Sequence, residues 1–399
     1  MKKTWYKKLL AVAAATVMTC SMSIAALADQ AADATATAQG ENNVAVKIQK
    51  HLHIANGITT PNATFTFSFT AKDSTSVAQA DVPALNNATV AYTAADTTRS
   101  GDNNEHIVKQ SENIFAAAAY TQPGEYIYGV KEEQTGFTAN AQATDRLTYD
   151  QSEYDMHVIV KQKTDKSGYY ISSVYFKRTK DETGAADNAG AKKDPGENGN
   201  GSATYELFNN TYTKDAGKEE PNDPTPDANK KSLTISKTVE GAFGDKSRDF
   251  EFTLTVNKPH TETAATVDAK KGADTVTVTY GTPTTFKLKH GESLTFDRLP
   301  AGANYTLVET GTKNYKAKMD YKENGEDKTV AEGAEAASAT ATTVLIGEKT
   351  NDNRVTNTFQ DNNITPTGLL INNLPFILMI IGAIALIGFT MISKRRFQD

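Results

Sequence analysis

Lysine, glutamate and asparagine recur in the same order in two β-rich stretches of this 399-residue chain. Each stretch opens on an alternating run with a lysine, V-K-I-Q-K-H-L in the first and L-T-I-S-K-T-V in the second. A tyrosine run with glutamate then follows a proline, and an asparagine stands in each closing run, E-L-F-N-N-T and R-V-T-N-T-F. These residue types are suited to joining a lysine amine to an asparagine carboxamide, with glutamate moving the proton.

The chemistry requires that all three groups be buried together. A lysine amine is a nucleophile only when neutral, and burial in an apolar core lowers its pKa. Burial raises the pKa of a glutamate, so its carboxyl group can hold a proton and donate it to the carboxamide oxygen. The amine then attacks the carbonyl, ammonia leaves and a Lys–Asn amide remains. Fixed placement replaces an external enzyme by raising the effective concentration.

This pattern resembles the streptococcal pilin isopeptide-linkage domain and its CnaB-like relatives. The resemblance covers both β-rich stretches and is most specific at Y-T-L-V-E-T, residues 305–310. It implies that a lysine and an asparagine in each stretch form the bond and that a glutamate catalyses it. The matching positions are Lys50, Glu132 and Asn210 in the first stretch, and Lys237, Glu309 and Asn357 in the second.

Two of these assignments have neighbours that fit the pattern as well. Glu133 stands beside Glu132, and Lys47 is an alternative to Lys50 on the same run.

The elements that must position these residues are short strands. Runs such as A-T-F-T-F-S-F-T and Y-D-M-H-V-I-V alternate with period two and are rich in Val, Ile, Thr, Phe and Tyr, and no long amphipathic helix competes with them. We therefore predict an all-β chain of two tandem Ig-like, CnaB-like β-sandwich domains, at 43–213 and 232–360. A flexible leader (29–42) precedes them, and a charged, Pro-rich linker (214–231) separates them.

The N-terminus predicts export. Four lysines precede an apolar run, and the small-residue site Ala26-Leu27-Ala28 follows it. This order is typical of a cleaved signal peptide, here residues 1–28. An N-terminal membrane anchor is the alternative, but the apolar run is short and rich in alanine.

The C-terminus, residues 361–399, resembles a cell-wall sorting signal. An apolar segment at 374–392 is about one bilayer long and ends in Lys394-Arg395-Arg396. A P-T-G box stands upstream, which argues against a plain tail anchor. The resemblance implies that a sortase cuts between Thr367 and Gly368 and passes the threonine carbonyl to an amine. The whole box is Ile364, Thr365, Pro366, Thr367 and Gly368.

Composition limits the other classes of function. After both cuts, 35 basic and 47 acidic residues would remain of the 42 and 48 in the chain, so nucleic acid is not an expected partner. The only cysteine, Cys20, lies in the signal peptide, so the mature chain would lack disulfides and Cys-based zinc sites. The one close histidine pair, His51 and His53, does not by itself predict a metal site. We expect no cofactor, no metal and no enzymatic turnover beyond the self-directed crosslink.

Two roles fit a secreted, peptidoglycan-anchored Gram-positive surface protein with this architecture. The first is the backbone subunit of a sortase-assembled pilus (fimbrium) that supports cell adhesion. The second is an ancillary pilin or anchored adhesin that does not polymerise. A secreted enzyme with sandwich accessory domains is a third reading that no residues support.

The expected partners are a pilin-class sortase, a housekeeping sortase, other pilin subunits, peptidoglycan and a host-surface ligand. Related pilins place the acceptor lysine shortly before the first-domain asparagine, but S-A-T-Y-E-L-F has none there. Lys192 and Lys193, in a Gly- and Asp-rich segment predicted as a loop, are the candidate acceptors. Lys177 and Lys180 are weaker alternatives.

Overall fold

The computed structural model describes most of the two β-rich stretches. The described residues are 41, 44–193, 196–198, 202–220 and 225–360, with 375, 376, 378–381, 383, 384 and 387 in the C-terminal part. The predicted signal peptide, nearly all of the leader, and the box at 364–368 lie outside them. The described residues after 374 are helical, and no described helix is long and apolar enough to cross a membrane.

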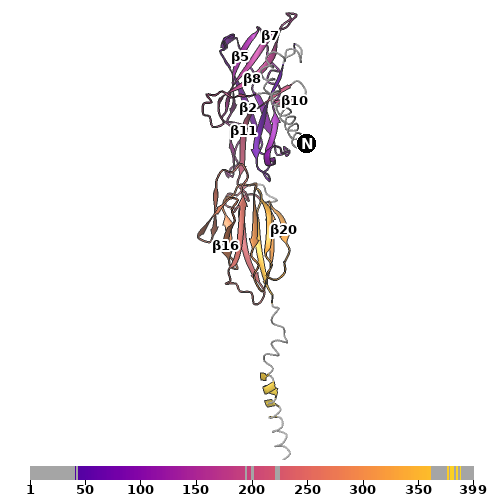
Figure 1. The fold of residues 1–399 in the computed structure, drawn as a ribbon, viewed down its shortest axis with the longest axis vertical. Coiled ribbons are helices and arrows are strands. Elements are labelled where there is room, and N and C mark those ends of the chain that lie inside the picture. Colours follow the sequence, from indigo (N-terminus) through magenta and orange to yellow (C-terminus); the bar gives the residue numbers. More distant parts are fainter. Residues whose placement is uncertain are drawn as a thin grey trace, which may run out of the picture. The chain divides into compact units, whose positions relative to one another are not determined.

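The described chain is an all-β protein that divides into two compact units (Figure 1). The first unit is formed by the described residues of Met1–Lys230, with Lys258–Thr263 and Pro300–Gly302. The second is formed by those of Lys231–Asn257, Ala264–Leu299 and Ala303–Asp399. Two 3-10 turns, η1 (Gln79–Asp81) and η2 (Asp102–Asn104), lie in the first unit.

Two sheets build the first unit. One has the order β10-β11-β1-β4, with β6 also paired to β11, and the other has the order β3-β2-β5-β7-β8-β9. The strands are β1 (Ala45–Ile54), β2 (Ala63–Lys72), β3 (Ala88–Tyr92), β4 (His106–Gln110), β5 (Gly124–Glu133), β6 (Asp145–Thr148), β7 (Glu153–Gln162), β8 (Tyr169–Lys180), β9 (Lys192–Lys193), β10 (Gly196–Asn198) and β11 (Ser202–Lys214). The sheets pack face to face, and the rings of Phe67 and Phe208 stack between them with centroids 5.1 Å apart.

Two further sheets build the second unit, in the orders β15-β14-β17-β12-β22-β19-β20 and β16-β13-β18-β21. The strands are β12 (Leu233–Glu240), β13 (Phe250–Asn257), β14 (Thr266–Lys271), β15 (Asp274–Thr279), β16 (Thr284–Leu288), β17 (Ser293–Phe296), β18 (Ala303–Glu309), β19 (Tyr315–Glu323), β20 (Glu326–Val330), β21 (Ala339–Ile346) and β22 (Asp352–Phe359). In both units the first strand pairs in parallel with the last long strand, β1 with β11 and β12 with β22.

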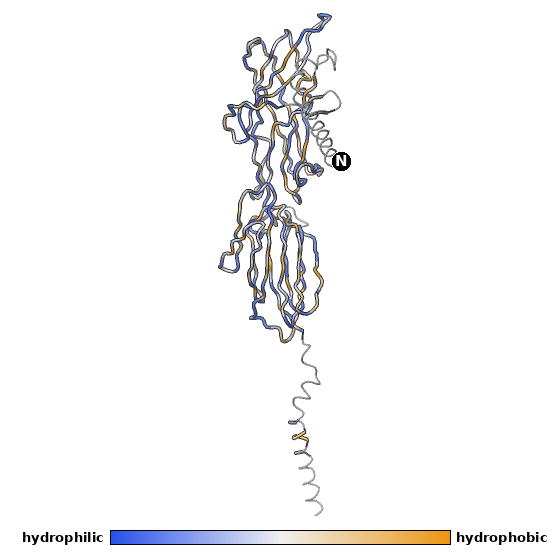
Figure 2. The backbone as a smooth tube through the Cα atoms, in the orientation of Figure 1, coloured by the Kyte–Doolittle hydropathy of each residue, from blue (hydrophilic) through white to orange (hydrophobic). Residues whose placement is uncertain are grey.

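The period-two pattern of the sequence places one face of strands such as β1 and β12 in the core. Figure 2 shows hydrophobic and hydrophilic residues interspersed along the strands. On β1, every second residue is buried, and Lys50 occupies one of these inward positions between Ile48 and Leu52. On β12, Lys237 likewise lies between the buried Ile235 and Val239. Alternation alone therefore turns one lysine of each first strand into the sandwich.

Residues 214–219, which the sequence assigns to the start of the linker, are buried and belong to the first unit. Lys214 is the last residue of β11, and its Nζ donates to Glu219 Oε1 at 2.6 Å. Lys218 is also buried, and its Nζ donates to the carbonyl oxygen of Ala228 at 3.3 Å. These hydrogen bonds pair the buried charged groups, so the segment can pack against the first unit although it is rich in charge.

The segment predicted as an exposed loop before residue 202 contains two short strands. Lys192 and Lys193 form β9, which pairs with β8 at the edge of its sheet. Arg178 Nε donates to Asp187 Oδ2 at 2.7 Å and ties the connection between β8 and β9 to the sheet. The side chains of the two lysines therefore point to opposite faces of the sheet.

A glycine after β5 gives a test of how this strand is held. Gly136 has φ +92°, and a Cβ there would lie 1.8 Å from the carbonyl oxygen of Thr64. We expect Gly136→Ala to cost at least about 2 kcal/mol of stability, because backbone strain adds to a clash with backbone. Calorimetry of the full chain measures the loss. Gly272→Ala is the control, since that site also has positive φ (+58°) but nothing within 4 Å of the added Cβ. An equal effect at both sites would contradict this account.

Candidate functional site

The structure brings Lys50, Glu132 and Asn210 together in the core of the first unit. Lys50 Nζ donates to Glu132 Oε2 at 2.9 Å, and Asn210 Nδ2 donates to Glu132 Oε1 at 2.8 Å. All three side chains are buried. The lysine and asparagine lie on neighbouring strands of one sheet, β1 and β11, while the glutamate reaches them from β5 in the facing sheet.

The second unit repeats this arrangement with Lys237, Glu309 and Asn357. Lys237 Nζ lies 3.0 Å from Glu309 Oε1, and all three side chains are buried. Lys237 and Asn357 lie on the paired strands β12 and β22, and Glu309 ends β18 in the other sheet. The same residue types therefore meet in the same sheets of both units.

The strand register is the same in both units. Lys50 is paired with Phe208, and Lys237 is paired with Val355, so each asparagine lies two residues beyond the partner of its lysine. Side chains two residues apart on a strand share a face. This offset therefore turns the lysine amine and the carboxamide into the same part of the core.

The glutamates also have equivalent partners. Glu132 is paired with Phe67 on β2, and Glu309 is paired with Phe252 on β13. These aromatic strands, A-T-F-T-F-S-F and D-F-E-F-T-L, each place a further phenylalanine beside the amine. Lys50 Nζ lies 5.1 Å from the ring centroid of Phe65, and Lys237 Nζ lies 4.4 Å from that of Phe250. Each amine is therefore enclosed by aromatic rings and one carboxyl group.

Burial shifts the pKa of the reacting groups in the direction that the chemistry needs. Burial lowers the pKa of Lys50 to about 8 and that of Lys237 to about 8, although the neighbouring carboxylates oppose the shift. Burial raises the pKa of Glu132 and of Glu309, against the opposing effect of the lysines. The state with a neutral amine and a protonated carboxyl group is therefore brought closer to the charged pair in free energy.

The carboxamide oxygens of the two units have different surroundings. Asn210 Oδ1 accepts a hydrogen bond from the backbone N–H of Asp150 at 2.9 Å. Among the described residues, neither Asn357 Oδ1 nor the carboxylate oxygens of Glu309 accept a hydrogen bond with good geometry. The first cluster thus holds its carbonyl oxygen before any reaction, and the second does not.

The alternatives that the sequence leaves open lie outside the clusters. Glu133 points to the other face of β5, where its carboxylate accepts from Ser68 Oγ at 2.6 Å and pairs with Lys131. Lys47 occupies a partly exposed position on the opposite face of β1 from Lys50. Asp150, by contrast, is a buried residue at the first cluster that sequence reasoning missed, because its contribution is a backbone N–H.

The candidate acceptor lysines point to opposite sides of β9. Lys192 is paired with the exposed Lys177, and Lys193 is paired with the buried Phe176. Directly opposed residues of an antiparallel pair share a face. Lys192 therefore projects from the outer face of the sheet and Lys193 toward the inner face. Lys180 is engaged elsewhere, with Nζ 2.8 Å from Glu153 Oε1.

Lys192 stands at the end of a polar row across the outer face. Its Nζ lies 5.5 Å from the ring centroid of Tyr175, which stacks on His157 at 4.4 Å. Both side chains donate to Glu125 Oε1, from His157 Nδ1 at 2.8 Å and from Tyr175 Oη at 3.2 Å. The box that would supply the acyl group, 364–368, lies outside the described residues.

The histidine pair offers no metal site in the described structure. His51 and His53 share the outer face of β1, where the His53 ring packs against that of His106 with centroids 4.0 Å apart. Burial lowers the pKa of His53 to about 4. Among the residues that the structure describes, no group of three or more His, Cys, Asp or Glu side chains is placed to hold a metal ion.

Comparison with known proteins finds an isopeptide-containing family that matches the first unit. Residues 46–213 match the Spy0128-like isopeptide containing domain (FctA), which spans the strands that carry the first cluster. The chain is 24% identical over 381 residues to a pilin of Streptococcus pyogenes serotype M1, which covers 91% of this chain and 95% of that protein. The first unit thus matches the Spy0128-like isopeptide containing domain, and the chain is similar to a streptococcal pilin over nearly its full length.

Further similarities of this pilin homologue are more limited in extent. Residues 231–344 match a domain of unknown function (DUF7601), and the match ends before β22, which carries Asn357. The pilus tip adhesin Cpa of Streptococcus pyogenes is 38% identical over 91 residues, which cover 23% of this chain and only 13% of that protein. The crystal structure of the major pilin from Streptococcus pyogenes covers 80% of this chain and 99% of its own, with 22% identity and a TM-score of 0.33.

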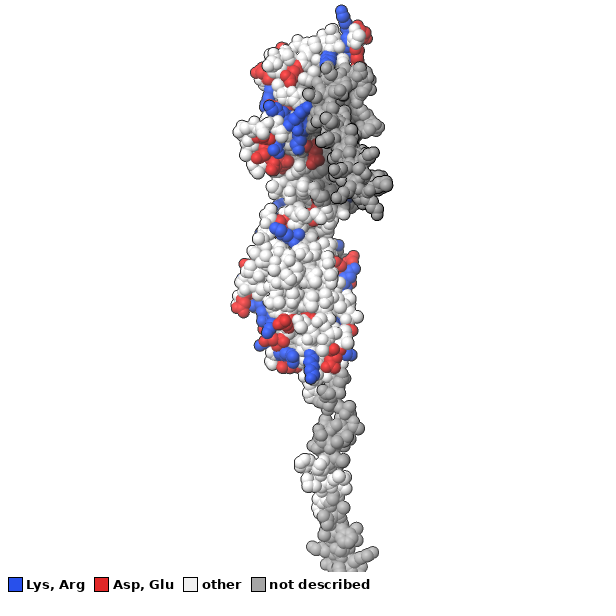
Figure 3. All heavy atoms as spheres, in the orientation of Figure 1, with Lys and Arg blue, Asp and Glu red and all other residues white. Residues whose placement is uncertain are grey.

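The similarity to pilins bears on the class of function, and the surface charge bears on the expected partners. Pilins are structural proteins, so the chain is not an enzyme in the sense of turning over a substrate. On the face drawn in Figure 3, Lys and Arg side chains are intermixed with Asp and Glu instead of gathering in one basic patch.

The shared proton of the Lys–Glu pair predicts a bell-shaped pH dependence of bond formation. At low pH the amine keeps its charge while the carboxyl group is also protonated, so no nucleophile exists. Once the pH exceeds the pKa of Lys50, about 8, and that of Glu132, which burial raises, both groups have lost their protons and no acid remains. We expect the rate in the first unit to be greatest between these limits. The loss of mass of freshly translated full-length chain, followed at a series of pH values, measures it; a rate that rises steadily to pH 10 would contradict this prediction.

Proposed function

We propose that this chain is the backbone subunit of a sortase-assembled covalent pilus and that a Lys–Asn isopeptide bond crosslinks each of its two domains. The observation that carries the proposal is the pair of buried clusters with one register and one set of sheets. A solvated lysine and a turn asparagine would not meet a buried carboxyl group twice in equivalent places. The homology to streptococcal pilin over nearly the full chain supports the same role.

Each bond would form by acyl transfer within the core. The neutral lysine Nζ attacks Cγ of the asparagine, the C–N bond to the carboxamide nitrogen breaks, and ammonia leaves. The protonated glutamate gives its proton to the departing nitrogen, takes up the proton that the attacking amine loses, and is regenerated. In the first domain this links Lys50 to Asn210, and in the second it links Lys237 to Asn357. No cofactor enters the balance, and close placement supplies the effective concentration.

The positions of the bonds suit a fibre under tension. Each bond would join the first strand of a domain to the last long strand, which lies beside it in parallel. Pulling on the two ends of a domain then acts on neighbouring strands that are covalently joined, so the sheets between them carry little of the force. The predicted mature chain has no cysteine, and an amide also resists reduction.

Surface attachment is the second half of the proposal. The signal peptide 1–28 would be removed on export, and the sorting signal 361–399 would hold the chain at the membrane until sortase cleaves after Thr367. A pilin-class sortase would join Thr367 to a lysine of the next subunit, and a housekeeping sortase would transfer the finished fibre to peptidoglycan. The protein would then reside in the cell wall and pilus, where it supports adhesion.

Lys192 is the better acceptor of the two candidates. Its side chain projects outward from β9, where an acyl-sortase can reach it, whereas Lys193 is directed toward the core side. The row formed by Tyr175, His157 and Glu125 would give the amine a fixed polar surrounding. Lys177 lies opposite Lys192 and provides a matched exposed control.

A second role has one specific observation in its favour. The sequence identity to a pilus tip adhesin, 38% over 91 residues, is higher than the 24% identity to the pilin. The adhesin match covers only 23% of this chain. An ancillary pilin or anchored adhesin would carry the same crosslinks and sorting signal but would not polymerise.

Extraction of cell walls separates the two roles. In walls released by a muralytic enzyme and boiled in detergent, we expect an antibody to the chain to detect a ladder of high-mass bands. Lys192→Arg should abolish the ladder, since a guanidinium keeps the charge but does not accept an acyl group. Lys193→Arg and Lys177→Arg should leave it intact. A single band near monomer mass from the unaltered chain would favour the ancillary role.

The crosslinks predict a lowered mass for the unaltered chain and a lowered stability for variants that cannot form them. Each bond should lower the intact mass by about 17 Da, the ammonia released by acyl transfer. Asn210→Ala should restore one such loss and lower the Tm of the first domain by roughly 10–20 °C, on the chain-entropy estimate of about 5 kcal/mol for a closed loop of this length. Asn209→Ala, on the neighbouring exposed side chain, should change neither quantity. A full sequence mass for the unaltered chain would refute the crosslinks.

A further inference from the structure

The orientation of the Asn210 carboxamide assigns different partners to its oxygen and its nitrogen. Oδ1 faces the backbone N–H of Asp150 at 2.9 Å, and Nδ2 faces Glu132 Oε1 at 2.8 Å. A backbone N–H can only donate, so the atom that faces it must be the oxygen. Glu132 therefore lies against the nitrogen that would leave as ammonia.

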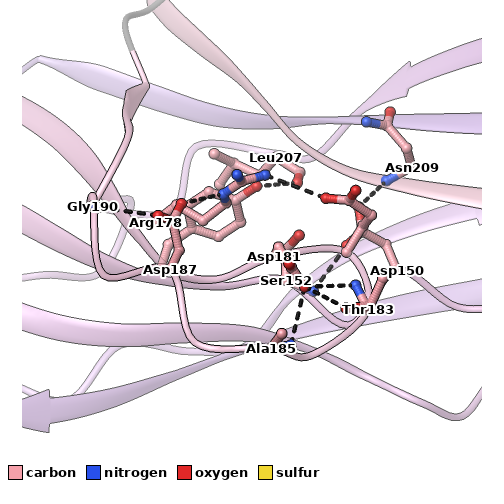
Figure 4. A network of polar contacts seen from close by, with 12 residues as sticks. Asp150, Ser152, Arg178, Asp181, Thr183, Ala185, Asp187, Gly190, Leu207 and Asn209 are labelled. Atoms are coloured by element: carbon pink, nitrogen blue, oxygen red, sulfur yellow. Dashed lines mark hydrogen bonds and ion pairs between the residues drawn. The ribbon is translucent and has the colours of Figure 1, made fainter.

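The carboxylate of Asp150 fixes the position of its own N–H. Asp150 lies between β6 and β7 and is buried. Its Oδ1 accepts from the backbone N–H of Ser152 at 2.8 Å, and its Oδ2 accepts from the backbone N–H of Asn209 at 2.8 Å (Figure 4). The first bond shapes the turn, and the second ties the turn to β11 at the residue next to Asn210. The N–H donor and its target are thus held by one side chain.

Negative charge develops on the carboxamide oxygen when the amine attacks. A donor already aimed at that oxygen stabilises the tetrahedral intermediate without reorganisation, and in a buried site its effect is larger than in water. The second domain lacks this feature in its described residues, since Asn357 Oδ1 accepts no hydrogen bond. There Glu309 is the ionisable group beside the carboxamide, and burial raises the pKa of Glu309.

We propose that the backbone N–H of Asp150 is the oxyanion donor for isopeptide formation in the first domain and that the Asp150 carboxylate is its positioning group. This inference rests on the proposed crosslink. Lys50 Nζ attacks Cγ of Asn210, and the electron pair of the carbonyl moves to Oδ1, where the Asp150 N–H binds it. Protonated Glu132 gives its proton to Nδ2, the carboxylate so formed takes the proton that Nζ loses on attack, the Cγ–Nδ2 bond breaks, and ammonia leaves. The oxyanion collapses to the new amide carbonyl.

The charge of Asp150 acts on the same pair from the turn. The Asp150 charge raises the pKa of Glu132, in the same direction as burial, and so favours the protonated acid. It also raises the pKa of Lys50, but burial lowers that pKa by more. Asn210 and the phenylalanine rings also act on the pair. The titratable groups that interact with it are Tyr92 and Tyr149, with Glu132, and His51 and His53, with Lys50. Removing the Asp150 charge should therefore move the acid limb of the pH profile, which a purely structural role would not do.

The two domains allow the test within one molecule. Full-length chain is made by cell-free translation, samples are taken over time, and the crosslinked peptides of each domain are quantified by mass spectrometry. We expect Asp150→Ala to slow the Lys50–Asn210 bond by about tenfold to a hundredfold, somewhat less than outright removal of an oxyanion donor. The Lys237–Asn357 bond should form at its unaltered rate and serves as the internal reference.

Two further variants separate positioning from general stability. Asp145→Ala removes another buried carboxylate of the same unit, which accepts from Asn140 N and Tyr212 Oη and does not touch Asn210. It should leave the rate unchanged. Asp150→Asn keeps one acceptor and is the milder variant: it should slow the bond less than Asp150→Ala and shift the acid limb to lower pH.

The outcomes distinguish this inference from the function on which it rests. An unaltered rate in both Asp150 variants, or equal slowing by Asp145→Ala, would overturn the role of Asp150 while leaving the crosslink in place. Absence of the Lys50–Asn210 peptide from the unaltered chain would instead overturn the proposed crosslink itself.

Discussion

Burial of a lysine side chain in an apolar core costs free energy unless the amine loses its charge or gains a partner. Both domains contain such a buried lysine. Lys50 and Lys237 are each enclosed by phenylalanine rings and a single carboxyl group. A neutral amide in place of the amine would remove the charge from the core altogether. If the proposed bond forms, the unreacted fold is its precursor, and the free-energy cost of the buried charge favours the reaction.

The same constraint explains the topology around each cluster. The amine and the carboxamide must share a face of one sheet, which the parallel pairing of the first and last long strands provides with an offset of two residues. The acid must come from the facing sheet, and the strand ends that carry Glu132 and Glu309 lie opposite Phe67 and Phe252. A slip of one residue in any of these strands would turn the group out of the core.

In the first domain a bulge decides which of two adjacent asparagines points into the core. The register of β1 and β11 shifts between Gln49 and Lys50, so Leu207 is passed over, and the Tyr154 hydroxyl donates to its carbonyl oxygen at 2.6 Å. Without this shift, alternation from the buried Tyr205 and Leu207 would have turned Asn209 inward. The bulge places Phe208 and Asn210 there instead and exposes Asn209.

Period-two patterning leaves a direct trace in the sequence and was sufficient to predict the strands and the all-β class. The positions that meet in each cluster were identified through the resemblance to pilin isopeptide-linkage domains. Other features leave no such trace. The donor at Asp150 is a backbone group, which every residue but proline carries. The burial of 214–219 depends on tertiary pairing of Lys214 with Glu219, and β9 forms only because β8 provides an edge. Local composition predicted exposure in both segments.

The two clusters reach one chemistry with different demands on the acid. Asn210 Oδ1 already accepts a hydrogen bond from the Asp150 N–H, and Glu132 contacts the carboxamide nitrogen instead. With Asn357 Oδ1 buried and accepting no hydrogen bond, the oxygen carries the cost of an unsatisfied polar atom until a donor reaches it. A protonated Glu309 is such a donor, and burial raises its pKa in that direction. In the proposed mechanism, the second domain would depend on its acid to polarise the carbonyl, whereas in the first domain the backbone N–H of Asp150 would do so.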